Sequence, residues 1–192
     1  MSEGTQEIEP PDAGIRLLVA GDDERRAVVV RDASADAIEL ETFPRAAFFH
    51  LWSGSMTDPL DDPGGTPAGR WIPEPGAFRF GVSVLPPAYG NGAPLDLDEI
   101  RRSLPGLAEA LDPDETGMHT TGMHATDTLD LVYVAAGRVV LDLGADERVL
   151  VAGDAVVQRG NRHAWRNDGP DPCVLVITML GAAPGRPDGD PR

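Results

Sequence analysis

Hydrophobic and polar residues alternate along the second half of the chain, a pattern typical of short β-strands. Between residues 124 and 136, a period of two gives one face made of His124, Thr126, Thr128, Asp130, Val132 and Val134. Further short segments of this kind follow at residues 138–143, 147–152, 155–158, 162–167 and 173–180. The sequence Gly144-Ala145-Asp146 predicts a hairpin between the first two of these segments. These six strands predict a small antiparallel barrel with a polar mouth.

The first half of the chain predicts more strands and one helix. Strands are expected at residues 15–19, 27–31, 37–41, 45–52 and 76–85. Since six strands are too few to close a barrel of two sheets, we expect these to complete or extend it, within one subunit or across a dimer. The helix is expected from Leu95 to Leu111, with Asp96 as N-cap and Glu99 in the capping-box position. Pro105 should kink or split it.

Two of these N-terminal strands carry a polar side chain in an apolar pattern. In segment 45–52, His50 shares a face with Phe48 and Trp52, which favours a packed core or interface histidine over a pocket residue. In segment 76–85, Arg79 projects from the face opposite to the phenylalanines. Arg79 then either clamps a substrate carboxylate in a bidentate fork or forms a surface ion pair. The ion pair is the expected outcome in so acidic a chain.

Composition and length indicate a globular chain that is either one domain or a domain with extensions. The chain has 192 residues, of which 41% are hydrophobic, enough to bury a core. We expect a disordered acidic tail at residues 1–13 and a loose tail at residues 183–192. Residues 14–113 should form strands, a long loop and a helix that pack on the barrel, and residues 114–182 the barrel itself. The single cysteine, Cys173, cannot form an internal disulfide and is expected in the core.

The charge of the chain excludes several classes of function. Its formal net charge is -16, and it contains no lysine. We therefore expect no binding to nucleic acid or to an anionic membrane, because phosphate contacts need clustered cations. Schiff-base chemistry and a Walker-type phosphate loop, which need lysine, are excluded too. No apolar run is long enough to span a membrane, and the acidic start is unlike a signal peptide, so a cytoplasmic protein is expected.

Side chains that could bind a ligand or take part in catalysis lie on two of the predicted strands. His163 and Trp165 share a face of the segment that follows the turn Arg159-Gly160-Asn161, while His124 and Asp130 lie on the polar face described above. Two strands could therefore aim imidazoles into the barrel. Trp165 then either stacks on an aromatic ligand or fills the core. His119, in a glycine-flanked loop, is either a replacement ligand or a solvent-exposed residue.

The spacing of these residues resembles that of the cupin family. The first cupin motif is His, any residue, His, three or four residues, Glu, six residues, Gly; here it reads His124-Ala125-Thr126, Asp130 and, after six residues, Gly137. The second is Gly, two residues, His, three residues, Asn, here Gly160, His163 and Asn167. The resemblance covers about the last eighty residues. It implies an all-β fold, the double-stranded β-helix or jelly roll of the family.

The resemblance also implies a metal site, because motif histidines and a carboxylate commonly hold a divalent ion in cupins. His124, Asp130 and His163 would be the ligands, and the ion would be Fe, Zn, Mn or Ni. Thr126 replaces the second motif histidine, and a hydroxyl is a poor ligand for such metals. Asp130 replaces the glutamate and falls about 1.5 Å short of it. Since Asp130 lies about 20 Å of extended chain beyond His124, a bend or bulge within residues 126–129 is required.

These observations lead to three hypotheses. The first is a small-molecule metalloenzyme with His124, Asp130 and His163 as catalytic residues, either a dioxygenase or a lyase, isomerase or dehydratase. Its substrate would be a carboxylated or aromatic, polyketide-like metabolite of a secondary pathway. The second is metal-free acid/base catalysis by Asp130 and His163, and the third a non-catalytic cupin that binds a small ligand. Candidate substrate-binding residues are Arg79, Trp165, Thr126, Thr128 and His50. A homodimer is expected from the surplus N-terminal strands and the aromatic segment 48–52.

Overall fold

The structure is a computed structural model, and it describes residues 14–23, 26–59, 70–92, 94–113 and 120–183. The expected disordered tail at residues 1–13, most of the loose C-terminal tail and His119 lie outside these residues. Strands dominate the fold, as predicted. None of the described helices is long and apolar enough to cross a membrane.

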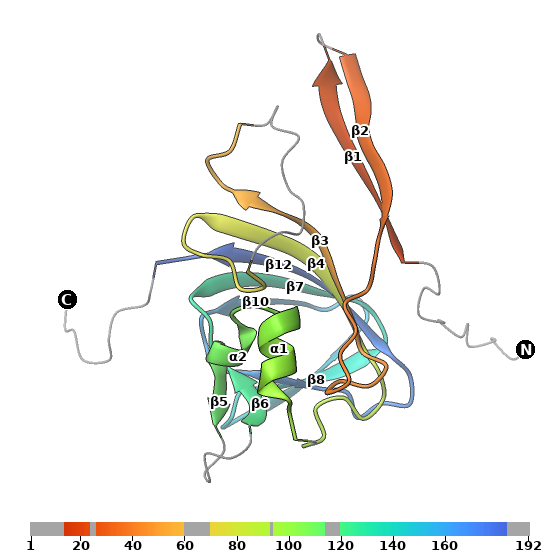
Figure 1. Ribbon diagram of the computed structural model, residues 1–192. Helices are drawn as coiled ribbons and strands as arrows, with labels where there is room; N and C mark the ends of the chain where they lie inside the picture. The colour runs from red at the N-terminus through yellow and green to blue at the C-terminus, as the bar shows by residue number, and fades with distance from the viewer. Residues whose placement is uncertain (1–13, 24–25, 60–69, 93, 114–119, 184–192) are drawn as a thin grey trace, which may run out of the picture.

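Two sheets face each other and form the jelly roll (Figure 1). The larger sheet has five antiparallel strands in the order β10 (Ala155–Arg159), β7 (Thr128–Ala136), β12 (Cys173–Gly181), β4 (Ala77–Leu85) and β3 (Ala47–Ser55). The smaller sheet has the order β11 (Ala164–Arg166), β8 (Arg138–Asp142) and β9 (Glu147–Val151). A pair formed by β5 (Leu111–Pro113) and β6 (Thr120–His124) is joined to it by a bridge between His124 and His163. The all-β jelly roll expected from the sequence is confirmed.

Two of the N-terminal strands complete the larger sheet within the same chain. β4 pairs with β12 along eight residues, and β3 pairs with β4. The barrel therefore includes strands from both halves of the sequence. The predicted hairpin between β8 and β9 is also present, since the Leu143 amide donates to the carbonyl of Asp146.

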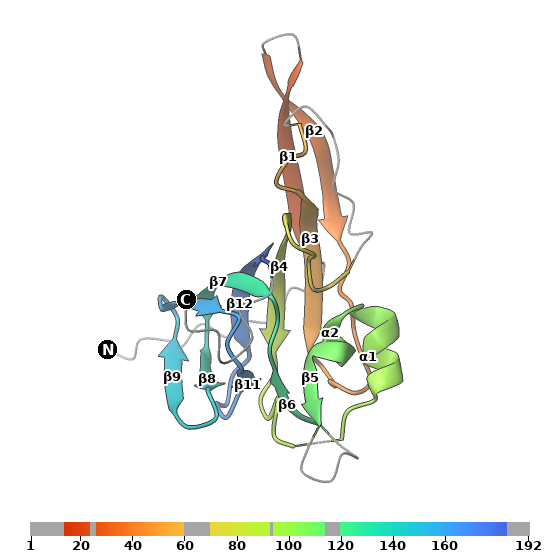
Figure 2. The ribbon, with the colours of Figure 1, turned by 90° about the vertical axis from the view of Figure 1, so that its left-hand side faces the viewer.

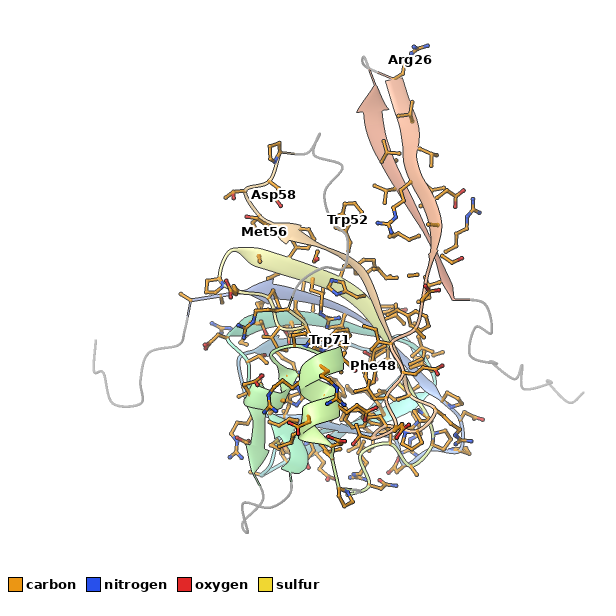
Figure 3. The ribbon with its side chains drawn as sticks, in the orientation of Figure 1. Arg26, Phe48, Trp52, Met56, Asp58 and Trp71 are labelled. Atoms are coloured by element: carbon orange, nitrogen blue, oxygen red, sulfur yellow. The ribbon has the colours of Figure 1, made fainter. Side chains whose placement is uncertain are left out.

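The first two strands form a hairpin of their own. β1 (Ile15–Asp23) and β2 (Arg26–Ala35) pair with each other and project away from the barrel (Figure 2). Figure 3 shows Arg26 at the outer end of this hairpin. The hairpin base packs on the outer face of the larger sheet, where it covers the cluster Phe49, Leu51, Val82 and Val84.

The strand expected at residues 37–41 is wrong. Only Ile38 forms an isolated bridge, with Phe48, and the chain then turns. The turn is fixed by Glu99, whose two carboxylate oxygens accept hydrogen bonds from the amides of Glu41 and Thr42 at 2.7 and 2.9 Å. These amides are therefore not available to pair with a neighbouring strand. The predicted capping-box role of Glu99 is also wrong, because both of its carboxylate oxygens accept hydrogen bonds from these amides.

The predicted helix is split, as expected from Pro105. It consists of α1 (Leu97–Ser103) and α2 (Leu107–Ala110). Asp96 is the N-cap of α1, since its side chain accepts hydrogen bonds from the amides of Asp98 and Glu99 at 3.0 Å each. Ile100 of α1 and the adjoining Leu104 are fully buried in the interior core. The helical segment thus closes the barrel on the side of Phe48 and Trp71, whose rings meet edge to face at 5.9 Å.

The chain bends between β6 and β7, where the sequence required a bend. Residues 125–127 leave the ladder, and the Ala182 amide donates to the Asp127 carbonyl at 2.9 Å. The single strand expected from residue 124 to residue 136 is therefore two strands, which belong to opposite sheets. As a result, His124 and Asp130 reach the barrel interior from opposite sides.

Candidate functional site

The two histidines of the predicted site lie side by side on adjacent strands. His124 ends β6, His163 directly precedes β11, and each backbone amide donates to the other's carbonyl at 2.9 Å. Directly opposed residues of an antiparallel pair project from the same face. The two imidazoles are accordingly 4.2 Å apart between ring centroids, inclined at 53°. This distance is within the limit of about 6 Å below which the two rings can share one ion.

Both imidazoles have their tautomer set by the backbone. Nδ1 of His124 lies 3.0 Å from the Gly122 carbonyl oxygen, and Nδ1 of His163 lies 3.0 Å from that of Asn161. Because a carbonyl only accepts, each Nδ1 carries the proton, and each Nε2 presents a lone pair. A left-handed glycine lies at or next to each acceptor: Gly122 itself beside His124, and Gly160 directly before Asn161. Histidines that bind a metal or accept a proton are commonly held in this way.

Asp130 belongs to a row of side chains across the larger sheet. Gln158 is directly opposite Asp130, Asp130 is opposite Met179, and Met179 is opposite Arg79. All four therefore project from one face, into the barrel. In the described part of the chain, three buried polar atoms of this row have no hydrogen-bond partner: Asp130 Oδ1, Gln158 Nε2 and Arg79 Nε. Unpartnered polar atoms that face a cavity indicate a polar ligand.

Arg79 is the most unusual member of the row. Only 2% of its surface is exposed. Its guanidinium carbon lies 3.6 Å from the centroid of the Trp71 ring, and its Nη2 donates to the Met179 sulfur at 3.0 Å. Burial lowers the pKa of Arg79 to about 9, against the opposing effect of Asp130. The expected surface ion pair is therefore wrong: Arg79 is buried, and none of the carboxylates that the structure describes lies within ion-pair distance of it.

Burial shifts the pKa values of the three predicted catalytic groups. It raises the pKa of Asp130, while the Thr128 hydroxyl and the Arg79 charge lower it. It lowers the pKa of His124 to about 4, with the neighbouring His163 as the second cause. It also lowers the pKa of His163. Both imidazoles are therefore neutral at neutral pH, and the carboxyl group is easier to protonate than an exposed one.

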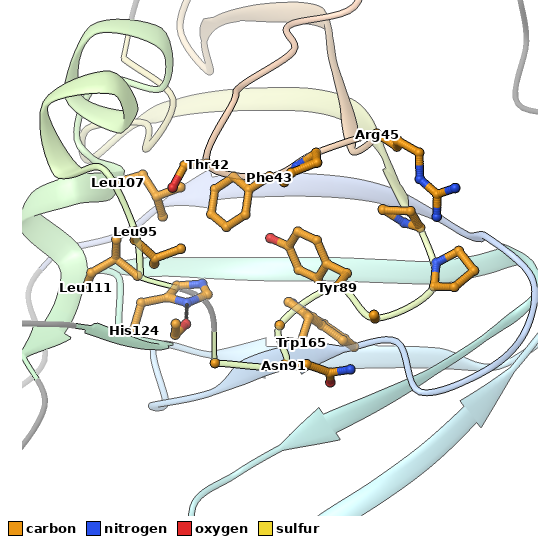
Figure 4. A pocket seen from close by; sticks show the side chains of 17 residues that line it. Thr42, Phe43, Arg45, Tyr89, Asn91, Leu95, Leu107, Leu111, His124 and Trp165 are labelled. Carbon is orange, nitrogen blue, oxygen red and sulfur yellow. Dashed lines mark hydrogen bonds between the residues drawn. The ribbon is translucent and has the colours of Figure 1, made fainter.

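Two cavities meet at this site. The inner one, of about 90 Å³, is lined by Arg79, Asp130, Gln158, His124 and His163 together with the aromatic residues Trp71 and Trp165. The outer one, of about 320 Å³, is mostly apolar and is lined by residues such as Phe43, Leu95 and Leu111 (Figure 4). Four residues line both cavities: Tyr89, Leu107, His124 and Trp165. His124 thus lies where the inner cavity, which contains Arg79 and Asp130, adjoins the outer one.

The predicted substrate-binding residues are divided by this geometry. Arg79 and Trp165 line the cavities, and Trp165 lies edge-on to His163 at 5.9 Å. Thr126 and Thr128 are buried beside the site, and their hydroxyls bond each other at 2.6 Å. His50 packs edge-on against Trp71 at 6.2 Å. These last three residues do not line either cavity.

Three residues of the site were missed in the sequence. Gln158 had a detectable signal, because it is a polar residue at an inward position of a strand. Trp71 and Tyr89 had none, since each reaches the site from a loop rich in glycine and proline.

Asn167 of the second motif has a structural role. It is fully buried, and its Nδ2 donates to the carbonyls of Leu85 and Asp171.

The donors offer an incomplete site for the metal that the family resemblance implies. Two imidazole nitrogens are free to bind an ion, and Asp130 Oδ1 is unpartnered. However, no three His, Cys, Asp or Glu side chains of the described ranges are grouped closely enough to hold a metal ion. The carboxylate comes from the sheet opposite the imidazoles, and packed sheets are about 10 Å apart. The set therefore fits an ion only through the two histidines.

Comparison with known proteins relates one segment of the chain to a known family. Residues 111–179 match the family model of the cupin domain. This segment is therefore similar to a cupin domain. It contains both motifs, with His124, Asp130 and His163. A solved cupin domain, that of Cnp3 from Schizosaccharomyces pombe, aligns over 86% of this chain and 87% of its own, with 12% identity and a TM-score of 0.42.

The curated relatives match about a third of this chain. Phomopsin biosynthesis cluster protein C' of Diaporthe leptostromiformis is 47% identical over 70 residues, 35% of this chain and 36% of its own length. The cupin-domain-containing oxidoreductase srdB of Neurospora crassa is 35% identical over 66 residues, 33% of this chain and 34% of its own. The chain thus spans about a third of the length of the curated relatives it matches.

Proposed function

We propose that this cupin is a small-molecule enzyme that transfers protons between the two sides of its substrate. The observation that carries the proposal is that the titratable groups reach the inner cavity from opposite sides. Asp130 projects into the inner cavity from the larger sheet, and the Nε2 atoms of His124 and His163 come from the opposite strands. A molecule bound between them meets a carboxyl group on one side and neutral imidazoles on the other.

Each group is suited to one half of a proton transfer. Burial favours the protonated form of Asp130, so its carboxyl group can donate a proton or, once ionised, accept one. The imidazoles are neutral, with Nδ1–H fixed on a carbonyl, so Nε2 is the accepting atom. A proton removed by one group and returned by the other on the opposite side amounts to an isomerisation; loss of water or ring closure needs the same two steps.

The outer cavity supports the class of substrate. Its 320 Å³ and its apolar lining fit the body of an aromatic or polyketide-like metabolite, with the reacting end in the inner cavity. Three matched relatives are named for biosynthesis clusters and one as an oxidoreductase. These names support a role in a biosynthetic pathway.

Hydrogen exchange tests this proposal. The purified protein is incubated with a metabolite extract of its source in D₂O, and mass spectrometry identifies the compound that gains deuterium or is converted. We expect Asp130→Asn and His163→Gln each to lower the rate by at least ~100-fold. Arg138→Met, outside both cavities, is the matched control. Full exchange in Asp130→Asn would contradict the proposal, and binding without exchange or conversion would support a non-catalytic ligand-binding cupin.

A metal-dependent enzyme is the second candidate, favoured by the fixed tautomers of the histidine pair. His124 and His163 would hold one divalent ion, with Asp130 across the cavity. A bound ion would supply a Lewis acid with open positions. Metal analysis of protein purified without a histidine tag separates the two candidates. A stoichiometric metal lost in both His124→Ala and His163→Ala would favour the metalloenzyme.

A further inference from the structure

We infer that Arg79 forms an anion-binding site in the inner cavity, called the seat below. It binds an anionic oxygen of the ligand, from a carboxylate or an enolate, and this oxygen lies over Met179. This inference rests on the proposed function, and it names the class of substrate for that site. The seat is distinct from the acid and base groups, because Arg79 lies two strands away from Asp130 in the larger sheet.

Among the described residues, Arg79 has no carboxylate within ion-pair distance. A guanidinium has five N–H donors. In the described part of the chain, its side-chain hydrogen bond goes to a sulfur, which is a weak acceptor, and Nε has no partner. A buried cation without a nearby anion is costly. An anionic ligand would supply both the missing charge and the missing acceptors.

The site is built to hold the guanidinium in place. The Trp71 ring stacks on the guanidinium, with 3.6 Å between the guanidinium carbon and the ring centroid, and the Met179 sulfur accepts a hydrogen bond from Nη2. Gly81, two residues along the strand, leaves room for it, because a Cβ at this position would lie 2.8 Å from Nη1. Trp71 and Met179 therefore hold the guanidinium in a defined orientation, as bidentate recognition of a carboxylate requires.

Asp130 acts on the charge of Arg79 from a distance but forms no ion pair with it. Met179 stands between the two residues in the row, and Asp130 Oδ1 has no partner among the described residues. The acceptors that the guanidinium lacks would therefore come from a bound molecule.

The spacing of the strands limits the substrate further. Two strand intervals separate the backbones of Asp130 and Arg79 by about 9.6 Å. Both side chains line the inner cavity together with Met179. When an anionic oxygen of the ligand binds Arg79, the ligand carbon that is one or two bonds away from the ligand's own carboxylate lies within reach of Asp130. The class that fits is an acid that reacts next to its carboxylate and whose apolar body extends into the outer cavity.

A pair of probes that differ in charge tests this seat. The probes are 3-phenylpropanoate and its neutral amide, 3-phenylpropanamide, and their binding is measured by calorimetry. We expect the wild-type protein to bind the carboxylate at least ~10-fold more tightly than the amide. Arg79→Met should reduce this ratio to about one by weakening the carboxylate alone. Arg138→Met, which removes an arginine that pairs with Asp168 outside the cavities, should leave the ratio unchanged.

Several results would overturn the inference. These are a ratio near one in the wild-type protein, no binding of either probe up to about 10 mM, and equal losses in Arg79→Met and Arg138→Met. Should Arg79→Met fail to fold by circular dichroism, Arg79→Lys decides: it keeps the charge but loses the fork, so the ratio should fall between that of the wild type and one. An unchanged ratio in Arg79→Lys would overturn the seat.

The seat and the proton transfer can fail separately. Asp130→Asn should keep the wild-type preference for the carboxylate while it loses deuterium exchange. A protein with normal exchange and no preference lacks the seat but keeps the proposed function. A protein with the preference and no exchange has the seat without the proton transfer.

Discussion

The imidazoles of His124 and His163 are 4.2 Å apart because the two residues exchange both backbone hydrogen bonds where β6 meets β11. A positive charge on one ring therefore opposes protonation of the other. Burial is the larger cause of the low pKa of His124, about 4, and His163 is the second. The pair should titrate as one coupled unit.

Replacing one ring should reveal this coupling. In His163→Gln we expect the pKa of His124 to rise from about 4 yet stay below its ordinary value, because burial remains. Imidazole NMR titration measures it. His50→Gln, whose ring packs on Trp71 away from the pair, is the control and should leave the His124 titration in place. An unchanged His124 titration in His163→Gln would show that the two rings are not coupled.

Asn167 should be essential for stability rather than for chemistry. Its Nδ2 donates to two carbonyls, and its Oδ1 accepts from the Gly169 amide at 2.9 Å. Asn167→Asp would set a buried carboxylate against those carbonyls, so we expect the free energy of unfolding to fall by about 3 kcal/mol or more. Urea denaturation measures this. Asn91→Asp, on the exposed loop, should change it by less than about 0.5 kcal/mol. Similar losses in both variants would contradict this role.

His50 should make stability depend on pH. Burial and the Arg79 charge lower its pKa to about 4, from 6.5 in the unfolded chain. Between these values the unfolded chain binds a proton that the folded protein does not, so the free energy of unfolding falls as pH drops from 6.5 toward 4. The slope is at most about 1.4 kcal/mol per pH unit for this group.

The comparison with His50→Gln isolates that contribution. Urea unfolding at about pH 7 and about pH 5 should show a smaller loss of stability in the variant, by up to about 2 kcal/mol. Asp130, with its raised pKa, acts in the opposite direction, but both proteins contain it, and its effect cancels. Identical losses in the two proteins would mean that His50 is protonated as easily in the folded state as in the unfolded one.

A homodimer remains our prediction, and the hairpin of β1 and β2 is where it can be tested. Leu18 and Val29 of this hairpin are 50% and 57% exposed. Light scattering should give about twice the chain mass of 20.4 kDa for the wild type and 20.4 kDa for the double variant Leu18→Arg, Val29→Arg. Val157→Arg, on exposed β10, is the control and should stay dimeric. A wild-type monomer at micromolar concentration would refute the prediction.

The strands were predictable because each has one face in the core. The alternation around Arg79 placed it opposite Phe80 and Val82, and the structure keeps that division between the inner cavity and the outer cluster. The chain length between His124 and Asp130 required a bend, and the bend is present. These features are local, so a sequence window contains them.

Features that depend on distant segments were not predictable. The burial of Arg79 depends on Trp71, which stacks on it from a loop, and on Met179, one hundred residues away. The role of Glu99 depends on the amides of Glu41 and Thr42, more than fifty residues earlier. In both cases the local pattern fits an ordinary surface position, and only the tertiary fold supplies the partner.

The segment that this protein shares with its relatives is shorter than the segment that folds. β12 lies inside residues 111–179 for most of its length, yet in the sheet it is flanked by β4, which is outside them. A chimera that exchanges residues 111–179 between two cupins would place a foreign β12 against the resident β4. Such an exchange would also separate Met179 from its own Arg79. Recombination within this family should therefore succeed only when β4 is transferred together with the domain.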